Sequence, residues 1–212
     1  MTSDPGTLTA TGLACRRGGR RLFRGLDMLL APGQALWLRG PNGCGKTSLL
    51  RLLAGLARPD DGEVRFEGAP VHALAPLQRG RLRFIGHANA LKGELRVGEA
   101  LGFLAGLHEG APIPRARLTA ALEHMGLPGR IDSPVASLSQ GQRRKAALAR
   151  LMLDDAPRTW LLDEPLDALD TDGVARFEAW LTAHVARGGA VLLTSHAPLA
   201  SPVLTPFEMA GA

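Results

Sequence analysis

A glycine-rich stretch between an apolar run and a helix-like pattern carries the first chemistry. Gly40, Gly45, Lys46 and Thr47 fit G-x-x-x-x-G-K-[ST], the spacing of a phosphate-binding loop. Glycines let successive backbone N–H groups converge on phosphate oxygens, and a helix beginning near Lys46 adds its positive dipole end. An ordinary glycine-rich turn is the plainer alternative, which the flanking strand and helix patterns disfavour. We predict a triphosphate site formed by Gly40, Pro41, Asn42, Gly43, Cys44, Gly45, Lys46, Thr47 and Ser48.

Two adjacent carboxylates follow a second apolar run. The stretch TWLLDE ends in Asp163 and Glu164, and a buried strand would deliver both to the edge of a sheet where α/β proteins bind ligands. We expect Thr47 and Asp163 to hold Mg²⁺, Lys46 to reach the β- and γ-phosphates, and Glu164 to orient and partly deprotonate the attacking water. An acidic pair that only caps the next turn is less consistent with the phosphate loop.

Short strand-like runs alternate with helical patterns, which is typical of an α/β fold with a parallel sheet. Strands are expected at 34–40, 62–68, 82–86, 158–164 and 190–195, and helices at 46–56 and 171–186. From 97 to 142 no strand is evident, and apolar residues recur at helical spacing. We therefore predict one domain over 1–212, with a core of 1–90 and 143–212 and an inserted helical subdomain at about 91–142.

Composition narrows the class of protein. The chain has 212 residues, 45% of them hydrophobic, and no stretch approaches the ~18 apolar residues of a membrane span. The N-terminus lacks the layout of a signal peptide, and two cysteines are too few for a disulfide framework, so we expect a cytosolic chain. The net charge of +5 is compatible with binding to nucleic acid or to anionic lipid. The arginines are spread along the chain, however, which favours a generally solvated surface.

A third motif, together with two later stretches, resembles the pattern of a known protein family. LSQGQ, at 138–142, resembles the signature motif of ABC-type ATPases, and it precedes the strand that ends in two acids. LDALD, at 166–170, looks like the D-loop of that family, and His196 stands where its switch histidine would be. The resemblance covers nearly the whole chain and implies a P-loop NTPase fold, the ABC ATPase core, with ATP hydrolysis that depends on Mg²⁺.

The resemblance also implies a partner subunit. In this family two ATPase subunits pair head to tail, and each ATP lies between the phosphate loop of one and the signature motif of the other. Ser139, Gly141 and Gln142 would then act in trans, and His196 would join Lys46 and Glu164 as a catalytic residue that contacts the γ-phosphate. A strand-end histidine bonded to nearby backbone is the alternative for His196.

Two positions depart from the family pattern. The chain has no tyrosine, so the aromatic residue that usually stacks on adenine is missing. When the family pattern is aligned with this sequence without gaps, Arg17 occupies the position of that aromatic residue. Its guanidinium can stack on the base or remain solvated. The usual glutamine after the strand at 82–86 is also missing, and spacing puts His87 in its place, with Asn89 as the second candidate.

Within the family, the chain resembles the ATP-binding subunits of the cytochrome c maturation (haem exporter) system. The stretches that carry this resemblance are 40–64, 86–87, 143–153 and 193–199. It implies a haem-transporting translocase at the cytoplasmic face of the inner membrane, with multi-spanning membrane subunits as partners and no direct haem binding. The alternatives are a soluble ABC ATPase that remodels a nucleic-acid complex, or the ATPase subunit of another exporter. Nucleic acid is disfavoured because long coiled coils, zinc cysteines and a second cassette are missing.

Overall fold

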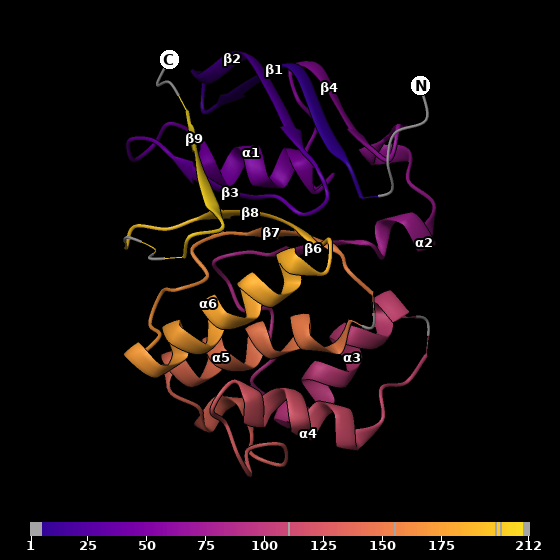
Figure 1. Cartoon of the computed structure of the whole chain (residues 1–212), viewed down its shortest axis with the longest axis vertical. Helices are drawn as coiled ribbons and strands as arrows, with labels where there is room; N and C mark the ends of the chain where they lie inside the picture. The colour runs from indigo at the N-terminus through magenta and orange to yellow at the C-terminus, as the bar shows by residue number, and fades with distance from the viewer. Residues whose placement is uncertain (1–5, 110, 155, 198, 200, 210–212) are drawn as a thin grey trace.

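A five-stranded parallel sheet forms the centre of the molecule in the computed structural model, which describes residues 6–109, 111–154, 156–197, 199 and 201–209 (Figure 1). The strand order is β6-β7-β8-β3-β9, and every pairing is parallel. The strands are β3 (Ala35–Arg39), β6 (Leu82–Ile85), β7 (Thr159–Leu162), β8 (Ala190–Thr194) and β9 (Leu204–Glu208). The predicted parallel α/β architecture is confirmed.

An antiparallel sheet of order β2-β1-β4-β5 packs on one side, with helix α1 (Lys46–Leu53) between the two sheets (Figure 1). Its strands are β1 (Leu8–Arg17), β2 (Arg20–Leu30), β4 (Asp61–Phe66) and β5 (Ala69–Pro70). Only β4 is expected from the sequence. Register shifts near Leu13 interrupt the alternation of β1 along its pairing with β2, and such bulges hide the period of two by which a strand is recognised.

The other face of the parallel sheet is covered by helices (Figure 1). The helical elements after α1 are η1 (Val71–Ala73), α2 (Pro76–Arg79), α3 (Val97–Glu109), α4 (Arg115–His124), η2 (Val135–Ser137), α5 (Gln140–Ala149), η3 (Arg150–Leu153) and α6 (Thr171–Ala186). As expected, no strand lies between β6 and β7 in the part of the chain that the structure describes. Helix α5 runs across the boundary at 142/143, so the division into core and helical subdomain does not coincide there with a break between elements.

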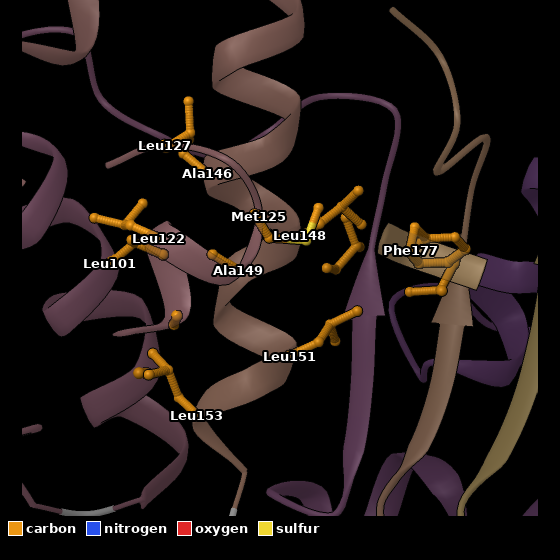
Figure 2. Close-up of a cluster of buried hydrophobic side chains, with 14 of the residues drawn as sticks. Leu101, Leu122, Met125, Leu127, Ala146, Leu148, Ala149, Leu151, Leu153 and Phe177 are labelled. Atoms are coloured by element: carbon orange, nitrogen blue, oxygen red, sulfur yellow. The ribbon is translucent and has the colours of Figure 1, made fainter. Parts of the chain in front are cut away.

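The parallel strands serve two hydrophobic cores at once. Along β3, Ala35 and Trp37 face the helical layer, whereas Leu36 and Leu38 face α1 and the antiparallel sheet. Figure 2 shows part of the core on the helical side, where side chains of α3, α4, α5 and α6 meet, including Leu101, Leu122, Leu148 and Phe177. Because both faces of β3, β7 and β8 are largely buried, these three strands are almost continuously apolar, and this is why they are recognisable in the sequence.

Candidate functional site

The ends of β3, β6, β7 and β8 meet the first turn of α1 at an open cleft of about 480 Å³. Parallel strands bring their carboxyl ends to one edge of the sheet, where ligands of α/β proteins bind. Of the predicted site residues, the cleft is lined by Arg17, Asn42, Gly43, Gly45, Lys46, Thr47, Ser48, His87, Asp163, Glu164 and His196. Four segments of the parallel core, those after β3, β6, β7 and β8, are thus brought together with the end of β1.

The phosphate loop has the backbone geometry that its glycines permit. Gly43 has φ of 79° and Gly45, the N-cap of α1, has φ of 106°, both in the left-handed region that L side chains rarely adopt. A Cβ on Gly45 would also lie 3.1 Å from side-chain atoms of Leu22 and Phe23. The loop therefore turns with exposed backbone toward the cleft, as anion binding at a helix N-terminus requires.

Cys44 differs from its neighbours in the loop. Its side chain is only 5% exposed and belongs to the hydrophobic core around α1, and its N–H donates to the Pro41 carbonyl at 3.2 Å. A Cβ on Gly40 would lie 3.0 Å from the Cys44 sulfur and from the Met209 carbonyl oxygen. The thiol thus points into the protein, and Gly40, Pro41 and Cys44 shape the loop without lining the cleft.

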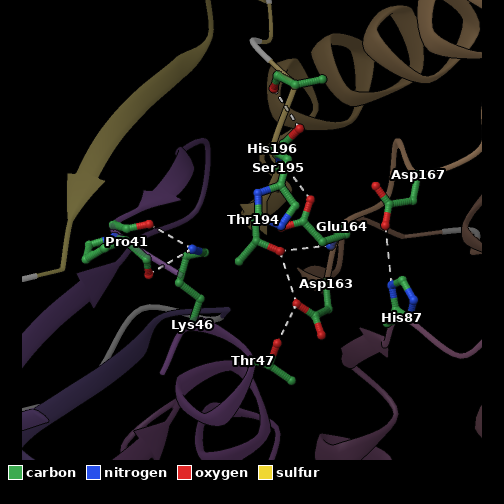
Figure 3. A network of polar contacts seen from close by, with 12 residues as sticks. Pro41, Lys46, Thr47, His87, Asp163, Glu164, Asp167, Thr194, Ser195 and His196 are labelled. Carbon is green, nitrogen blue, oxygen red and sulfur yellow. Dashed lines mark hydrogen bonds and ion pairs between the residues drawn. The ribbon is translucent and has the colours of Figure 1, made fainter. Parts of the chain in front are cut away.

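Lys46 lies over the loop at the start of α1 (Figure 3). Its ammonium Nζ donates to the carbonyl of Gly40 at 2.8 Å and approaches that of Pro41 at 3.4 Å. These contacts hold the cation at the centre of the loop, where the predicted triphosphate would lie. Both carbonyls are neutral acceptors, so a phosphate oxygen can replace them and form a stronger, charge-assisted hydrogen bond with the ammonium group.

A hydrogen-bonded network joins the ends of β7 and β8 to α1 (Figure 3). The hydroxyls of Thr47 and Thr194 both donate to Asp163 Oδ1, each at 3.1 Å. The Thr194 hydroxyl in turn accepts the backbone N–H of Glu164 at 2.8 Å. The sequence motifs do not single out Thr194, and the signal available for it is a hydroxyl residue at the end of the strand before His196.

Glu164 and His196, both predicted catalytic residues, contact each other. The carboxylate Oε2 of Glu164 accepts the backbone N–H of His196 at 2.9 Å, and the imidazole Nε2 lies 3.6 Å from Oε1. Glu164 has φ of 50°, a left-handed conformation that is uncommon for a residue other than glycine and is found at functional sites. The carboxylate is therefore held in one orientation at the cleft by the strand end that carries the histidine.

The loop after β6 offers two candidate side chains, and they point to different places. His87 lines the cleft, and its Nδ1 lies 3.4 Å from Asp167 Oδ2 in the predicted D-loop. The side-chain oxygen of Asn89 instead accepts a hydrogen bond from Arg144 at 3.1 Å. The geometry therefore favours His87 over Asn89 as the residue that faces a nucleotide.

The predicted signature residues lie outside the cleft of their own chain. Ser139 caps α5, where its hydroxyl accepts the N–H of Gln142 at 3.2 Å and its own N–H donates to the Gln142 side chain at 3.1 Å. A Cβ on Gly141 would lie 2.4 Å from the Ala168 carbonyl oxygen, so the motif packs tightly on the D-loop. Neither Ser139, Gly141 nor Gln142 is part of the cleft lining.

The fold and the cleft define a phosphate-loop nucleotide-binding domain. The family model described as "ABC transporter" matches residues 23–167. The chain is 50% identical over 193 residues to the cytochrome c biogenesis ATP-binding export protein CcmA of Pseudomonas putida (strain GB-1), covering 89% of each chain. It is 45% identical over 190 residues to the CcmA protein of Albidiferax ferrireducens, covering 90% of each. The chain therefore belongs to the ABC transporter family and, within it, to the family of CcmA proteins.

Solved structures agree on the fold. A putative ABC transporter ATP-binding protein from Pyrococcus furiosus superposes with a TM-score of 0.80 at 24% identity, covering 94% of this chain and 96% of that one. The dimeric bacterial ABC transporter cassette MJ0796 gives a TM-score of 0.82 at 19% identity, covering 95% and 94%. Among the described residues, no helix is both long and apolar enough to cross a membrane.

Proposed function

We propose that this chain is the ATP-hydrolysing subunit of an ABC exporter complex that serves cytochrome c biogenesis by energising haem delivery. The observation that carries the proposal is the convergence of Lys46, Thr47, Asp163 and Glu164 at one cleft, in a chain that belongs to the CcmA family. The cleft volume of about 480 Å³ lies within the range of small-molecule sites, ~300–1,000 Å³.

The residues of the cleft fit Mg²⁺ as well as ATP. Thr47 and Asp163 supply hydroxyl and carboxylate oxygens, the donors that this hard cation prefers. Within the described residues, no group of three or more His, Cys, Asp or Glu side chains could hold a metal by itself. This agrees with a cation held by one or two protein oxygens and completed by phosphate and water. Bound Mg²⁺ would neutralise charge that develops on the phosphates.

The roles of the remaining residues follow from their positions. Lys46 and the N–H groups of the loop bind the phosphates. Glu164, oriented by the His196 N–H, accepts a proton from the attacking water as the water oxygen bonds to the γ-phosphorus and the bond from that phosphorus to the β,γ-bridging oxygen breaks, so that ADP leaves. The imidazole of His196, on the same strand end, contacts the γ-phosphate. Arg17 and Leu22 also line the cleft, and the base would lie against them.

A second copy of the chain would complete each site. Ser139 is exposed and stands outside its own cleft, so in a head-to-tail dimer it can reach the phosphates of the other subunit. The solved structure of the cassette MJ0796 is dimeric, which supports the pairing of two subunits. We therefore propose that ATP joins two subunits and that hydrolysis releases them.

An apolar surface on α3 supports a membrane partner. Phe103 and Leu107 are 60% and 65% exposed, and they lie one helical turn apart on α3, the same face of the helix. Exposed apolar groups of this kind mark interaction surfaces. We propose that multi-spanning subunits of the cytochrome c maturation system bind the chain there, at the cytoplasmic face of the inner membrane, and that haem itself is bound elsewhere.

The proposal is tested with Glu164→Gln, which keeps the shape of the side chain but removes the base. We expect ATP binding to persist, turnover to fall by ~10²–10⁴-fold, and the variant to elute as a dimer in size-exclusion chromatography with saturating ATP. Lys46→Ala, which should not bind ATP, is the control that stays monomeric. A Glu164→Gln protein with near-normal turnover removes Glu164 from the mechanism, and a monomer at saturating ATP refutes the shared site. Co-purification from membranes with multi-spanning proteins, rather than with nucleic acid, tests the exporter assignment.

A further inference from the structure

Arg144 is a buried cation that the motifs of the site do not use. It lies on α5, five residues after Ser139, and is only 2% exposed. Its Nη2 donates to the carbonyl of Asp163 at 2.7 Å and to that of Glu164 at 2.6 Å, and its Nε donates to the carbonyl of Pro165 at 3.2 Å. One side chain thus holds three consecutive carbonyls of the turn that carries both acids of the cleft.

The same guanidinium also holds the loop after β6. Nη1 donates to the carbonyl of Gly86 at 2.9 Å and to the side-chain oxygen of Asn89 at 3.1 Å. These two residues bracket His87, the loop residue that lines the cleft. All five N–H donors of a guanidinium are used, so Arg144 links the loop after β6, the acidic turn and α5 at a single point.

Burying the charged Arg144 side chain among these acceptors costs free energy, which indicates a role beyond packing. Every acceptor is a neutral oxygen, and burial lowers the pKa of Arg144 from its ordinary value, while the nearby carboxylates of Asp167, Asp163 and Glu164 act in the opposite direction. A buried cation without a directly bonded carboxylate is an expensive way to fill a core position. The five hydrogen bonds of Arg144 instead fix the geometry of the backbone around it, since four of them go to backbone carbonyls.

Glu164 is the residue that needs such fixing. Its φ of 50° lies in the left-handed region, where an L residue remains only if its surroundings over-determine it. The peptide groups on either side are both held, since the Glu164 N–H donates to Thr194 and the Glu164 carbonyl accepts from Arg144. Without Arg144, the second of these constraints is lost.

We infer that Arg144 is a positioning residue for hydrolysis, which ties the backbone of Glu164 and the loop around His87 to helix α5. A displacement of α5 relative to the sheet is thereby transmitted to the carboxylate that activates water. This inference rests on the proposed role of Glu164. It assigns to Arg144 no contact with the nucleotide, so nucleotide binding through the phosphate loop should not depend on it.

The test compares Arg144→Gln and Arg144→Met with Arg150→Met in the purified full chain, measuring kcat and KM for ATP, binding of a fluorescent ATP analogue, and Tm. Arg150 is the matched control, because it also donates to a backbone carbonyl, that of Phe84 at 2.9 Å, and burial lowers its pKa to about 10. We expect kcat of the Arg144 variants to fall by ~10- to 100-fold, with Met lower than Gln, as for misplaced catalytic groups. KM and analogue binding should stay near wild type.

Several results would overturn the inference. Wild-type kcat in Arg144→Gln would do so, as would a loss of kcat no larger than that of Arg150→Met at equal Tm. If neither Arg144 variant folds, Asn89→Leu decides: it removes one acceptor of the guanidinium that holds the Glu164 carbonyl, so it should lower kcat, and an unchanged kcat refutes the inference. Glu164→Gln is measured alongside, because an inactive Glu164→Gln with a fully active Arg144→Gln refutes this inference alone, whereas an active Glu164→Gln refutes the proposed function.

Discussion

His184 makes the stability of this protein depend on pH in a predictable direction. The residue lies on α6, is 1% exposed, and stacks on Trp160 with ring centroids 3.5 Å apart and an interplanar angle of 11°. Its Nε2–H donates to the carbonyl of Arg158 at 2.8 Å. Burial is the main cause that lowers the pKa of His184 from 6.5 to about 4. The native state therefore keeps this imidazole neutral at pH values where the unfolded chain protonates it.

The magnitude follows from linkage. Because the unfolded state binds the proton first as the pH falls, the free energy of unfolding decreases between the two pKa values, by ~1.36 kcal/mol per pH unit. The stabilisation is present in full above pH 6.5 and is lost as the pH falls toward 4. Between pH 7.5 and pH 5, His184 alone should lower the free energy of unfolding by about 2 kcal/mol.

Urea unfolding at pH 7.5 and pH 5 measures this loss. His184→Gln retains an N–H donor but cannot titrate, so its free energy of unfolding should fall by about 2 kcal/mol less than that of wild type over the same interval. His72→Gln, a change at an exposed histidine, is the control and should lose as much as wild type. If wild type and His184→Gln lose stability equally, the reasoning from burial is refuted.

Two other side chains give predictions about activity. Thr194→Val removes the hydroxyl between Asp163 and Glu164, so we expect stability to fall by ~1–3 kcal/mol with reduced kcat, because a buried N–H loses its partner; Thr194→Ser keeps the hydroxyl and should remain active, and urea unfolding with ATPase assays checks both. His87→Ala should leave basal ATPase largely intact but reduce stimulation by the membrane subunits in proteoliposomes. Equal loss of basal and stimulated rates would instead make His87 catalytic, and full stimulation would remove it from coupling.

Much of the fold is predictable because its local signals agree with its tertiary structure. Helix α6 begins and ends at the predicted residues, since Asp170 caps it and apolar positions recur at helical spacing. The strand β9 is missed because Pro206 lies within it, and proline argues against a strand unless the strand is at an edge, as β9 is. The extent of the antiparallel sheet is missed because bulges break its alternation.

The candidate site is likewise predictable from the sequence only in part. Motif spacing predicts which loops meet, because parallel strands place their ends together. It does not predict that the Cys44 side chain turns into the core, that His87 rather than Asn89 faces the cleft, or that Thr194 and Arg144 hold the acidic turn. Those facts depend on contacts between residues that are far apart in the chain, which no local pattern records.

The sharing of each central strand between two cores has a consequence for folding. Trp160 and Leu161 are neighbours on β7, yet the first packs with the helical layer and the second with the layer around α1. If either layer separated from the sheet, it would expose to water one whole side of the strands on which the other layer depends. We therefore expect the two layers to melt together in a single cooperative transition, so that the acidic turn after β7 persists for as long as the protein is folded at all.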